Sequence, residues 1–313
     1  MIMECSACKA KAVHRNQGTN YCKKHFLDYF EAKVFKTIKK YNLLEKGDRV
    51  CVATSGGKDS IAALYTVSKY CRKNDIDFFA LAIDEGINGY RDHTLDDLES
   101  FCKKNKIKLN IVSFKERLGA TLDQIRDKAL KEQNKKPCTV CGIFRRSLLN
   151  KGSRELNATK LVTGHNLDDE AQTFLMNVFQ GNMSHNAKMG PITGIKTNRL
   201  FTPRVKPLYF ITEKETRLFC FLKGFSIHFN ECPNIDLSFR VKVRDKLNEV
   251  SEALPNAKYG VVNAFLEVLP DLKKKYENRV DLKECSSCGE PSTREKCNAC
   301  LLEEKLCLEM RIE

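Results

Sequence analysis

An apolar stretch that runs straight into a glycine-containing loop and then a helical pattern constrains the fold of this chain most. Residues 49–54 read RVCVAT, the loop SGGKDS occupies 55–60, and a helix is predicted over 60–73. Another helix is predicted over 94–105, and further β-rich stretches lie at 78–84, 109–114, 160–165 and 205–210. Strands that alternate with helices pair in parallel through right-handed crossovers. The sequence therefore predicts an α/β fold with a doubly wound, Rossmann-like parallel sheet of five strands.

Two more helices are predicted beside this alternation. Apolar side chains recur every four residues from Phe26 to Ile38, as they do along one face of a helix, here over 26–41. Thr212 is followed three residues later by Glu215, the capping-box pattern of a helix start.

Paired cysteines near both ends of the chain indicate two metal sites. The spacings are CxxC-x13-CxxH and CxxC-x8-CxxC, and the side chains are Cys5, Cys8, Cys22, His25, Cys285, Cys288, Cys297 and Cys300. A CxxC turn brings two thiolates to one metal ion, and a second pair of ligands completes a tetrahedron. Because four protein ligands leave no open position, we expect two structural Zn²⁺ ions. Cysteines that fall in pairs by chance are the alternative.

These metal sites divide the chain into an N-terminal zinc module at 1–27, a body at 28–280 and a C-terminal zinc module at 281–313. Neither module can bury a core of its own, so each depends on its metal. The 54 Lys and Arg against 40 Asp and Glu give a net charge of +14, which favours a polyanionic partner. No apolar run approaches the roughly 18 residues of a membrane span, and the chain starts without the apolar stretch of a signal peptide. We expect a cytosolic protein.

The SGGKDS loop has the residue types of a phosphate site. Gly56 and Gly57 let the backbone approach an anion, and the hydroxyls of Ser55 and Ser60 and the charge of Lys58 add to the amides at the start of the helix. In doubly wound sheets, ligands bind beyond the carboxyl ends of the strands, where this loop lies. A glycine turn that merely caps a helix is the alternative.

Asp59 is the acidic residue of the loop, and its carboxylate is compatible with phosphates only if Mg²⁺ lies between them. The stretch VATSGGKDS resembles the loop of the N-type ATP pyrophosphatases, which cleave ATP between the α and β phosphates and activate a carbonyl oxygen as an adenylate. This resemblance implies ATP and Mg²⁺ as ligands. It also adds Ala53, two residues before the loop, and Asp84, at the end of the next strand, to the candidate ATP contacts.

A second stretch narrows the family. TGHNLDDEAQTFLMN, residues 163–177, is similar to the second signature of the tRNA 2-thiolation enzymes of the TtcA/TtuA type and their archaeal and eukaryotic wobble-uridine relatives. Gly164 ends a strand where a nucleotide must pass close, while Asp168 and Asp169 open the next helix. There they can hold a metal ion or a ribose, and helix capping alone is the alternative for Asp168. For Asp169, the resemblance implies contact with ATP or Mg²⁺.

Three further cysteines match the same family. Cys138 and Cys141 lie in PCTVCGIFRRSLLN, and Cys232 lies in NECPNID. In the family these positions hold a 4Fe-4S cluster through three thiolates, which leaves one iron open for a sulfide. A zinc site, or Cys138 and Cys232 acting as a persulfide pair, are the alternatives. Arg145 follows Cys141 by four residues, where relatives carry lysine, and is placed to touch the nucleotide.

The resemblance implies a tRNA sulfurtransferase in which Lys58, Asp59, Asp169 and Arg145 are the candidate catalytic residues. A uridine O2 is adenylated, and sulfur then replaces AMP at C2. The stretch CGIFRR, together with the 15 cysteines, favours uridine 34, at the wobble position, over uridine 54 of the T-loop. Another adenylating enzyme of tRNA and a non-catalytic zinc RNA-binding module are the rival functions. The implied partners are tRNA, a second copy of the chain and a sulfur donor, either a ubiquitin-like thiocarboxylate protein or free sulfide.

Overall fold

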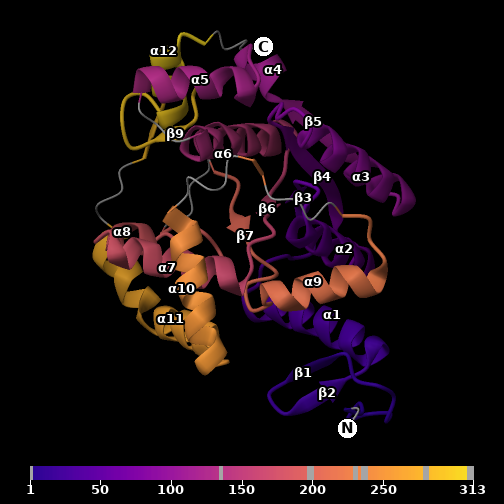
Figure 1. Ribbon diagram of the computed structural model, residues 1–313. Coiled ribbons are helices and arrows are strands. Elements are labelled where there is room, and N and C mark those ends of the chain that lie inside the picture. Colours follow the sequence, from indigo (N-terminus) through magenta and orange to yellow (C-terminus); the bar gives the residue numbers. More distant parts are fainter. Residues whose placement is uncertain are drawn as a thin grey trace.

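A five-stranded parallel sheet forms the centre of the molecule, in the order β5-β4-β3-β6-β7 (Figure 1). Its strands are β3 (Arg49–Ala53), β4 (Asp77–Asp84), β5 (Leu109–Ser113), β6 (Lys160–Val162) and β7 (Arg204–Val205). The computed structural model describes residues 3–133, 137–195, 201–227, 232–233, 239–277 and 282–308. The predicted fold class is confirmed. The order reverses between β3 and β6, and ligands bind at such switch points.

The fifth strand is much shorter than predicted. The prediction covered 205–210, but only Arg204 and Val205 pair with β6. The following residues turn back, because the backbone N–H of Tyr209 donates to the carbonyl of Lys206 at 3.1 Å. Tyr209 and Leu208 are fully buried, so their apolar character reflects a buried turn rather than a strand. The predicted stretch at 160–165 is also too long, since β6 ends at Val162.

Helices cover both faces of the sheet, as a doubly wound fold requires. The helices are α1 (Lys23–Lys40), α2 (Lys58–Lys73), α3 (Arg91–Lys104), α4 (Phe114–Leu118), α5 (Leu122–Gln133), α6 (Pro137–Glu155), α7 (Leu167–Phe179), α8 (Met183–Asn186), α9 (Glu213–Lys223), α10 (Phe239–Ala253), α11 (Ala257–Tyr276) and α12 (Asn298–Leu306). Val50 and Val52 of β3 belong to the core shared with α1, α2 and α9. Cys51 points to the opposite face, where it packs near Leu149 of α6.

The structure contains two further predicted helices, although α1 begins at Lys23, three residues earlier than predicted. Thr212 caps α9 together with Glu215 in a complete capping box, as predicted. The helix predicted over 26–41 is α1, and its Phe26, Phe30 and Val34 are fully buried. No helix among the described residues is long and apolar enough to cross a membrane.

The paired-cysteine modules lie at opposite ends of the molecule (Figure 1). The N-terminal module contains the hairpin of β1 (His14–Asn16) and β2 (Thr19–Tyr21). The C-terminal module combines β8 (Lys283–Glu284) and β9 (Pro291–Ser292) with α12, which packs on α5 and α6. The predicted module boundary at residues 280 and 281 lies outside the described residues.

Candidate ATP and metal sites

The SGGKDS loop leaves β3 at the carboxyl edge of the sheet and runs into α2, whose N-cap is Gly57. Ser60 Oγ accepts a hydrogen bond from the backbone N–H of Ser55 at 3.1 Å and donates one to the carbonyl of Gly57 at 2.8 Å. These two bonds close the loop on itself. The loop therefore presents the positive N-terminal end of α2, a preformed site for an anion.

The glycines of this region are required for different reasons. Gly56 has a φ of +82°, and an added Cβ would lie 2.4 Å from the carbonyl oxygen of Thr94. A Cβ on Gly164 would come within 2.9 Å of the Asp59 backbone, so Gly164 packs against the loop itself. Gly57 has an ordinary φ of −74°, and its Cβ would meet only Ser55 Oγ, at 3.5 Å. The space beside Gly57 is therefore open, which fits a bound phosphate.

Two carboxylates meet where α2 and α7 begin. Asn166 donates from Nδ2 to Asp59 Oδ1 at 3.0 Å, and its own Oδ1 accepts from the backbone N–H of Asp169 at 3.0 Å. Desolvation raises the pKa of Asp59, although Lys58 opposes the shift. Desolvation also raises the pKa of Asp169 to about 6; Arg240, 3.5 Å away, opposes this shift and the charge of Asp59 adds to it. A bound Mg²⁺ would offset the unfavourable burial of these two neighbouring charges, so the carboxylates are suited to bind it.

Lys58 is held between two acidic side chains. Its Nζ lies 2.9 Å from Asp59 Oδ2 and 2.8 Å from Glu213 Oε1. Desolvation works against the ammonium, but these carboxylates together raise the pKa of Lys58, so the side chain stays charged. Asp168 does not cap its own helix: it accepts from the backbone N–H of Glu213 at 2.9 Å and pairs with Lys258. Asp168 thus supports the start of α9.

An ion-pair chain with a buried centre connects the loop to α6. Arg91 donates from Nη1 to the carbonyl of Ser55 at 2.6 Å, and its Nε lies 3.0 Å from Glu85 Oε2. The other carboxylate oxygen of Glu85 lies 3.6 Å from Nη1 of Arg145. Glu85 and Arg91 are buried, at 5% and 2% exposure. The phosphate loop and α6 are therefore held by one set of contacts.

The remaining predicted ATP contacts lie at the same edge of the sheet. Ala53 is the last residue of β3 and Asp84 the last of β4. Asp84 Oδ1 accepts a hydrogen bond from the backbone N–H of Gly86 at 2.9 Å, which shapes the turn after β4.

Cys138 and Cys141 lie in the first turn of α6, three residues apart on one face of the helix. Desolvation raises the pKa of Cys141 to about 12; Arg145 opposes this shift, and the charges of Cys232 and Cys138 add to it. The three thiols are thus neighbours. Among the described residues they do not meet within 4.8 Å, as the ligands of one metal ion would. Because each thiolate of an iron-sulfur cube binds a different iron, wider spacing fits a cluster better than zinc.

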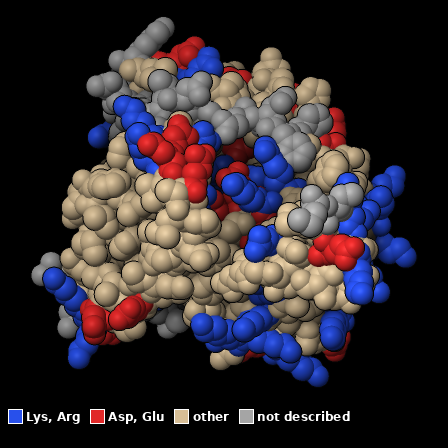
Figure 2. Space-filling view, turned by 60° about the horizontal axis from the view of Figure 1, so that its bottom comes forward, with Lys and Arg blue, Asp and Glu red and all other residues tan. Residues whose placement is uncertain are grey.

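His165 follows β6 and is exposed to solvent, yet its surroundings strongly disfavour its charged form. Desolvation lowers the pKa of His165 to about 3, and the charges of Lys206, Arg240, Arg204 and Arg145 contribute to the shift. Its Nδ1 lies 2.9 Å from Thr163 Oγ1. The side chain of His165 therefore lies among cationic side chains, although it reaches solvent. Figure 2 shows a face on which Lys and Arg side chains gather around a hollow that also contains acidic side chains.

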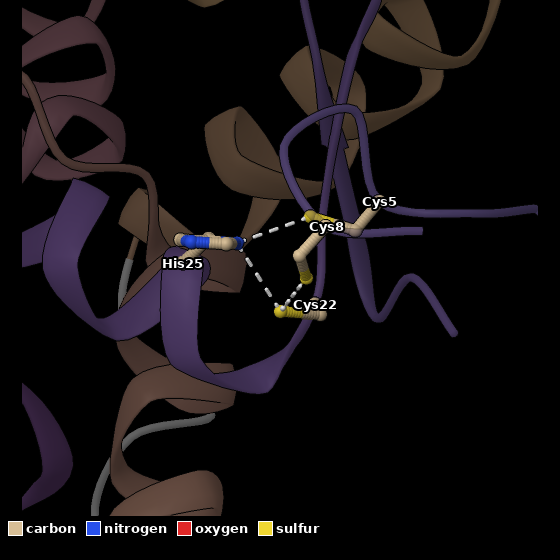
Figure 3. A group of neighbouring side chains, drawn as sticks. All are labelled: Cys5, Cys8, Cys22 and His25. Carbon is tan, nitrogen blue, oxygen red and sulfur yellow. Dashed lines mark hydrogen bonds between the residues drawn. The ribbon is translucent and has the colours of Figure 1, made fainter. Parts of the chain in front are cut away.

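The N-terminal ligand group has the geometry of a zinc site (Figure 3). Cys5 Sγ and Cys22 Sγ lie 3.3 and 3.5 Å from His25 Nδ1, and Cys8 Sγ lies 3.6 Å from Cys22 Sγ. A tetrahedral zinc ion with Zn–S bonds of about 2.3 Å places its ligand atoms about 3.5–3.8 Å apart. Cys22 is the N-cap of α1, so the site anchors the start of that helix.

The C-terminal ligand group is equally compact. Cys285 Sγ lies 3.8 Å from Cys300 Sγ, and Cys288 Sγ lies 3.7 Å from Cys297 Sγ. Although desolvation opposes it, backbone N–H donors lower the pKa of Cys285 to about 6, which favours the thiolate that binds metal. The backbone N–H of Cys297 is one of these donors, at 3.2 Å. Both predicted four-residue groups are therefore brought together by the fold.

The sequence did not reveal Glu85, Arg91, Asn166 and Arg240. Glu85 directly follows β4, so its place at the carboxyl edge of the sheet was a usable signal. Asn166 directly precedes a helix, and Asp169 lies three residues after Asn166, which is the pattern of the capping box of α7. Arg91 and Arg240 reach the site from other helices, and no local pattern identifies them.

The fold and the site together define a nucleotide-binding enzyme with a phosphate loop at the switch point of a parallel sheet. Comparison with known proteins agrees: the family model described as "PP-loop domain" matches residues 26–250. A tRNA 2-thiolation protein, NcsA from Haloferax volcanii, is 33% identical over 320 residues, covering 97% of this chain and 99% of the relative. A tRNA-5-methyluridine(54) 2-sulfurtransferase from Pyrococcus horikoshii is 33% identical and covers 95% of this chain and 93% of its own.

A solved structure is similar over nearly the whole length. The U34-tRNA thiolase NcsA from Methanococcus maripaludis, solved with its [4Fe-4S] cluster, has a TM-score of 0.83 and 32% identity, covering 97% of this chain and 96% of its own. The chain belongs to the PP-loop family, within its group of tRNA 2-thiolation proteins.

Proposed function

We propose that the chain catalyses ATP-dependent 2-thiolation of a uridine in tRNA and releases AMP and pyrophosphate. The observation that carries this proposal is the contact chain from Ser55 through Arg91 and Glu85 to Arg145. It joins the phosphate loop to the helix that carries Cys141. Such a connection would hold a site that cleaves ATP next to a site for sulfur, which is the arrangement that adenylation followed by thiolation needs.

In the first half-reaction, the uridine O2 attacks the α-phosphorus of ATP and the bond from that phosphorus to pyrophosphate breaks. The N-terminal end of α2 and Lys58 face the charge that builds up on pyrophosphate. Asp59 and Asp169 are the side chains that would hold Mg²⁺ beside the phosphates. Lys58 leaves its contacts with Asp59 and Glu213 to bind the nucleotide.

In the second half-reaction, sulfide attacks C2 of the adenylated uridine, the C2–O bond breaks and AMP leaves. Cys138, Cys141 and Cys232 are the residues that would hold a [4Fe-4S] cluster, which supplies an iron without a protein ligand where sulfide can be kept. Arg145 lies one turn from Cys141 and partly faces solvent, so it can bind the phosphate of the departing AMP. The two outer ligand groups would hold structural Zn²⁺.

We favour uridine 34 as the target. The M. maripaludis structure that shares the fold is a U34 thiolase. A relative of similar identity acts on 5-methyluridine 54, so the T-loop uridine is the second candidate. Residues 144–146, Phe-Arg-Arg, are the feature of this chain that resembles the wobble group.

We also propose that the protein works as a homodimer in the cytosol, with residues 28–280 as the ATP pyrophosphatase domain between the modules at 1–27 and 281–313. A relative from Laccaria bicolor, 34% identical over 96% of this chain, is named cytoplasmic tRNA 2-thiolation protein 1. A ubiquitin-like thiocarboxylate protein or free sulfide would supply the sulfur.

The position of the modified base is tested by mass spectrometry of tRNA nucleosides, mapped by position, from cells that lack the protein. We expect 2-thiouridine derivatives to be lost at position 34 and kept at position 54. Loss at position 54 alone would move the assignment to the T-loop. Unchanged 2-thiouridine at both positions would refute the proposed function.

The sulfur site is tested separately by the iron content and colour of protein purified without oxygen. We expect a brown protein with about four irons per chain, and Cys141→Ser should remove both the iron and the thiolation activity. A colourless, iron-free wild-type protein that still thiolates tRNA would favour the persulfide alternative for Cys138 and Cys232.

A further inference from the structure

Two arginines beside the cysteine-bearing turn of α6 form a pair of their own. Arg204 of β7 donates from Nη2 to the backbone carbonyl of Arg146 on α6 at 3.0 Å, which ties its guanidinium to that helix. Arg146 folds back along α6, because a Cβ on Gly142 would lie 3.1 Å from its Nη1. Arg146 is exposed and Arg204 is half-buried. Both guanidinium groups therefore reach the same side of the sheet.

Within the part of the chain that the structure describes, neither arginine has a carboxylate within ion-pair distance. The basic side chains around them do: Arg145 pairs with Glu85 at 3.6 Å and Lys206 with Glu170 at 2.6 Å. The acidic group that acts on Arg204 from a distance, Glu290, is already bound by Arg154 at 2.7 Å. Desolvation and the charge of Arg146 lower the pKa of Arg204 to about 10. Two like charges held together without an anion are unfavourable unless a ligand neutralises them.

The pair lies near His165 and the ion-pair chain rather than at a remote surface. Arg204 is among the charges that act on His165, the exposed side chain after β6. Arg146 follows Arg145, which contacts Glu85 of the chain that leads to the phosphate loop. In the sheet, β6 separates β7 from β3, so Arg204 stands two strands away from the loop that receives ATP.

We propose that Arg146 and Arg204 form a second phosphate site, which binds a phosphodiester group of the tRNA backbone next to the target uridine. This proposal rests on the proposed function and names how its substrate is held. The loop at residues 55–60 already offers a helix end and Lys58 to the phosphates of ATP. The guanidinium pair of α6 and β7 is instead available for the backbone that must approach the site together with the base. Paired guanidinium groups bind phosphate oxygens through several N–H donors at once.

The test measures tRNA binding by fluorescence anisotropy over a series of salt concentrations with the full-length, metal-loaded protein. We expect Arg146→Gln combined with Arg204→Gln to weaken tRNA binding about tenfold and to reduce the slope of log K against log salt by about 1, the contribution of one phosphate. Arg146→Lys should retain most of the slope, because the charge remains. ATP binding, measured by calorimetry, should be unchanged in all variants.

Arg72→Gln is the matched control, since Arg72 also donates to a backbone carbonyl, that of Asn105 at 2.6 Å, but lies in the last turn of α2, far from the loop. It should leave the salt slope as in the wild type. Circular dichroism checks folding. If the double variant is unstable, the single variant Arg146→Gln, at an exposed position, should show about half of the effect on tRNA binding. Unchanged tRNA binding in a folded double variant overturns the proposal. Weakened ATP binding with normal tRNA binding also overturns it, because the phosphate would then belong to ATP.

The two proposals can fail independently. A wild-type protein that binds tRNA through Arg146 and Arg204 but forms no 2-thiouridine would refute the function and keep the phosphate site. If the protein is active but its tRNA affinity does not change when both arginines are substituted, the phosphate site is refuted and the proposed function stands.

Discussion

Gly56 and Gly57 are adjacent in the phosphate loop, but the structure gives each a different reason to be glycine. Gly56 combines a positive φ with a close approach to the Thr94 carbonyl, so the fold itself requires it. Gly57 has an unstrained backbone and open space beside it. A ligand, rather than the protein, explains the second glycine.

Substitution by alanine separates these two roles. Gly57→Ala should leave the melting temperature near that of the wild type, because its Cβ has room, while the KM for ATP rises at least tenfold as the methyl group enters the phosphate space. Gly56→Ala should lower the free energy of unfolding by about 2 kcal/mol or more, since backbone strain and a clash act together. Thermal melts and pyrophosphate-release kinetics measure both effects. Equal loss of stability in the two variants would contradict this distinction.

His165 provides a prediction of pH dependence. Its folded-state pKa of about 3 lies below the ordinary value of 6.5. Between these two pH values, the unfolded chain binds a proton at His165 that the folded chain does not bind. The stability of the wild type should therefore fall as the pH drops below about 6.5, and His165→Asn should lessen that fall. Nuclear magnetic resonance of the histidine rings should show His165 neutral from pH 8 to pH 4.5. A titration midpoint near 6.5 would contradict the cation-rich surroundings of His165.

At the scale of elements, α6 carries the cysteines and Arg145, and two supports hold it. One is the ion-pair chain through Glu85, and the other is the C-terminal paired-cysteine module. Glu290 of that module binds Arg154 of α6 at 2.7 Å and also accepts a hydrogen bond from Asn150. Cys285, Cys297 and the buried side chains of α12 share one apolar core with the inner face of α6.

Glu85→Gln should be strongly destabilising for its size. It leaves the buried guanidinium of Arg91 without its ion-pair partner, which costs about 3 kcal/mol in the free energy of unfolding. The KM for ATP should also rise, since Arg91 holds the Ser55 carbonyl. Glu155→Gln is the control, because Glu155 is exposed and pairs with Arg117 at the surface, where about 0.5 kcal/mol or less is expected. If denaturant unfolding gives similar losses in the free energy of unfolding for both variants, the ion-pair chain through Glu85 does not stabilise the fold as proposed.

The two paired-cysteine modules should differ in their effect on the sulfur site. Cys288→Ser should lower the iron content of the protein, because the C-terminal module packs on the helix that carries Cys138 and Cys141. Cys8→Ser removes a zinc ligand at the other end of the molecule and should leave the iron content unchanged. Metal analysis of both variants, purified without oxygen, decides the matter. Equal loss of iron from both would mean that α6 does not depend on the C-terminal module.

At the scale of the whole molecule, the features that could be predicted from the sequence are those that depend on local patterns. The alternation of strands and helices predicted the parallel sheet, and ligand spacing predicted both four-residue metal groups, which the structure brings together. The fifth strand was predicted too long because buried apolar residues such as Leu208 look the same in a turn and in a strand.

The contacts that join the sites could not be predicted in this way. Arg91 reaches Ser55 and Glu85 from α3, and Arg240 reaches Asp169 from α10, 71 residues further along the chain. Such pairs follow from how the elements pack, and neither partner has a local pattern that reveals the other. The phosphate loop could therefore be read from the sequence, while its support could not.

The most direct test of the central claim is a reaction with purified protein, Mg²⁺, ATP, sulfide and unmodified tRNA under anaerobic conditions. Liquid chromatography and mass spectrometry would quantify 2-thiouridine, AMP and pyrophosphate. We predict one AMP and one pyrophosphate for each 2-thiouridine formed, and no product with Asp59→Ala, although that variant still binds tRNA. Formation of AMP without 2-thiouridine by the iron-loaded wild type, or thiolation that continues in Asp59→Ala, would contradict the account.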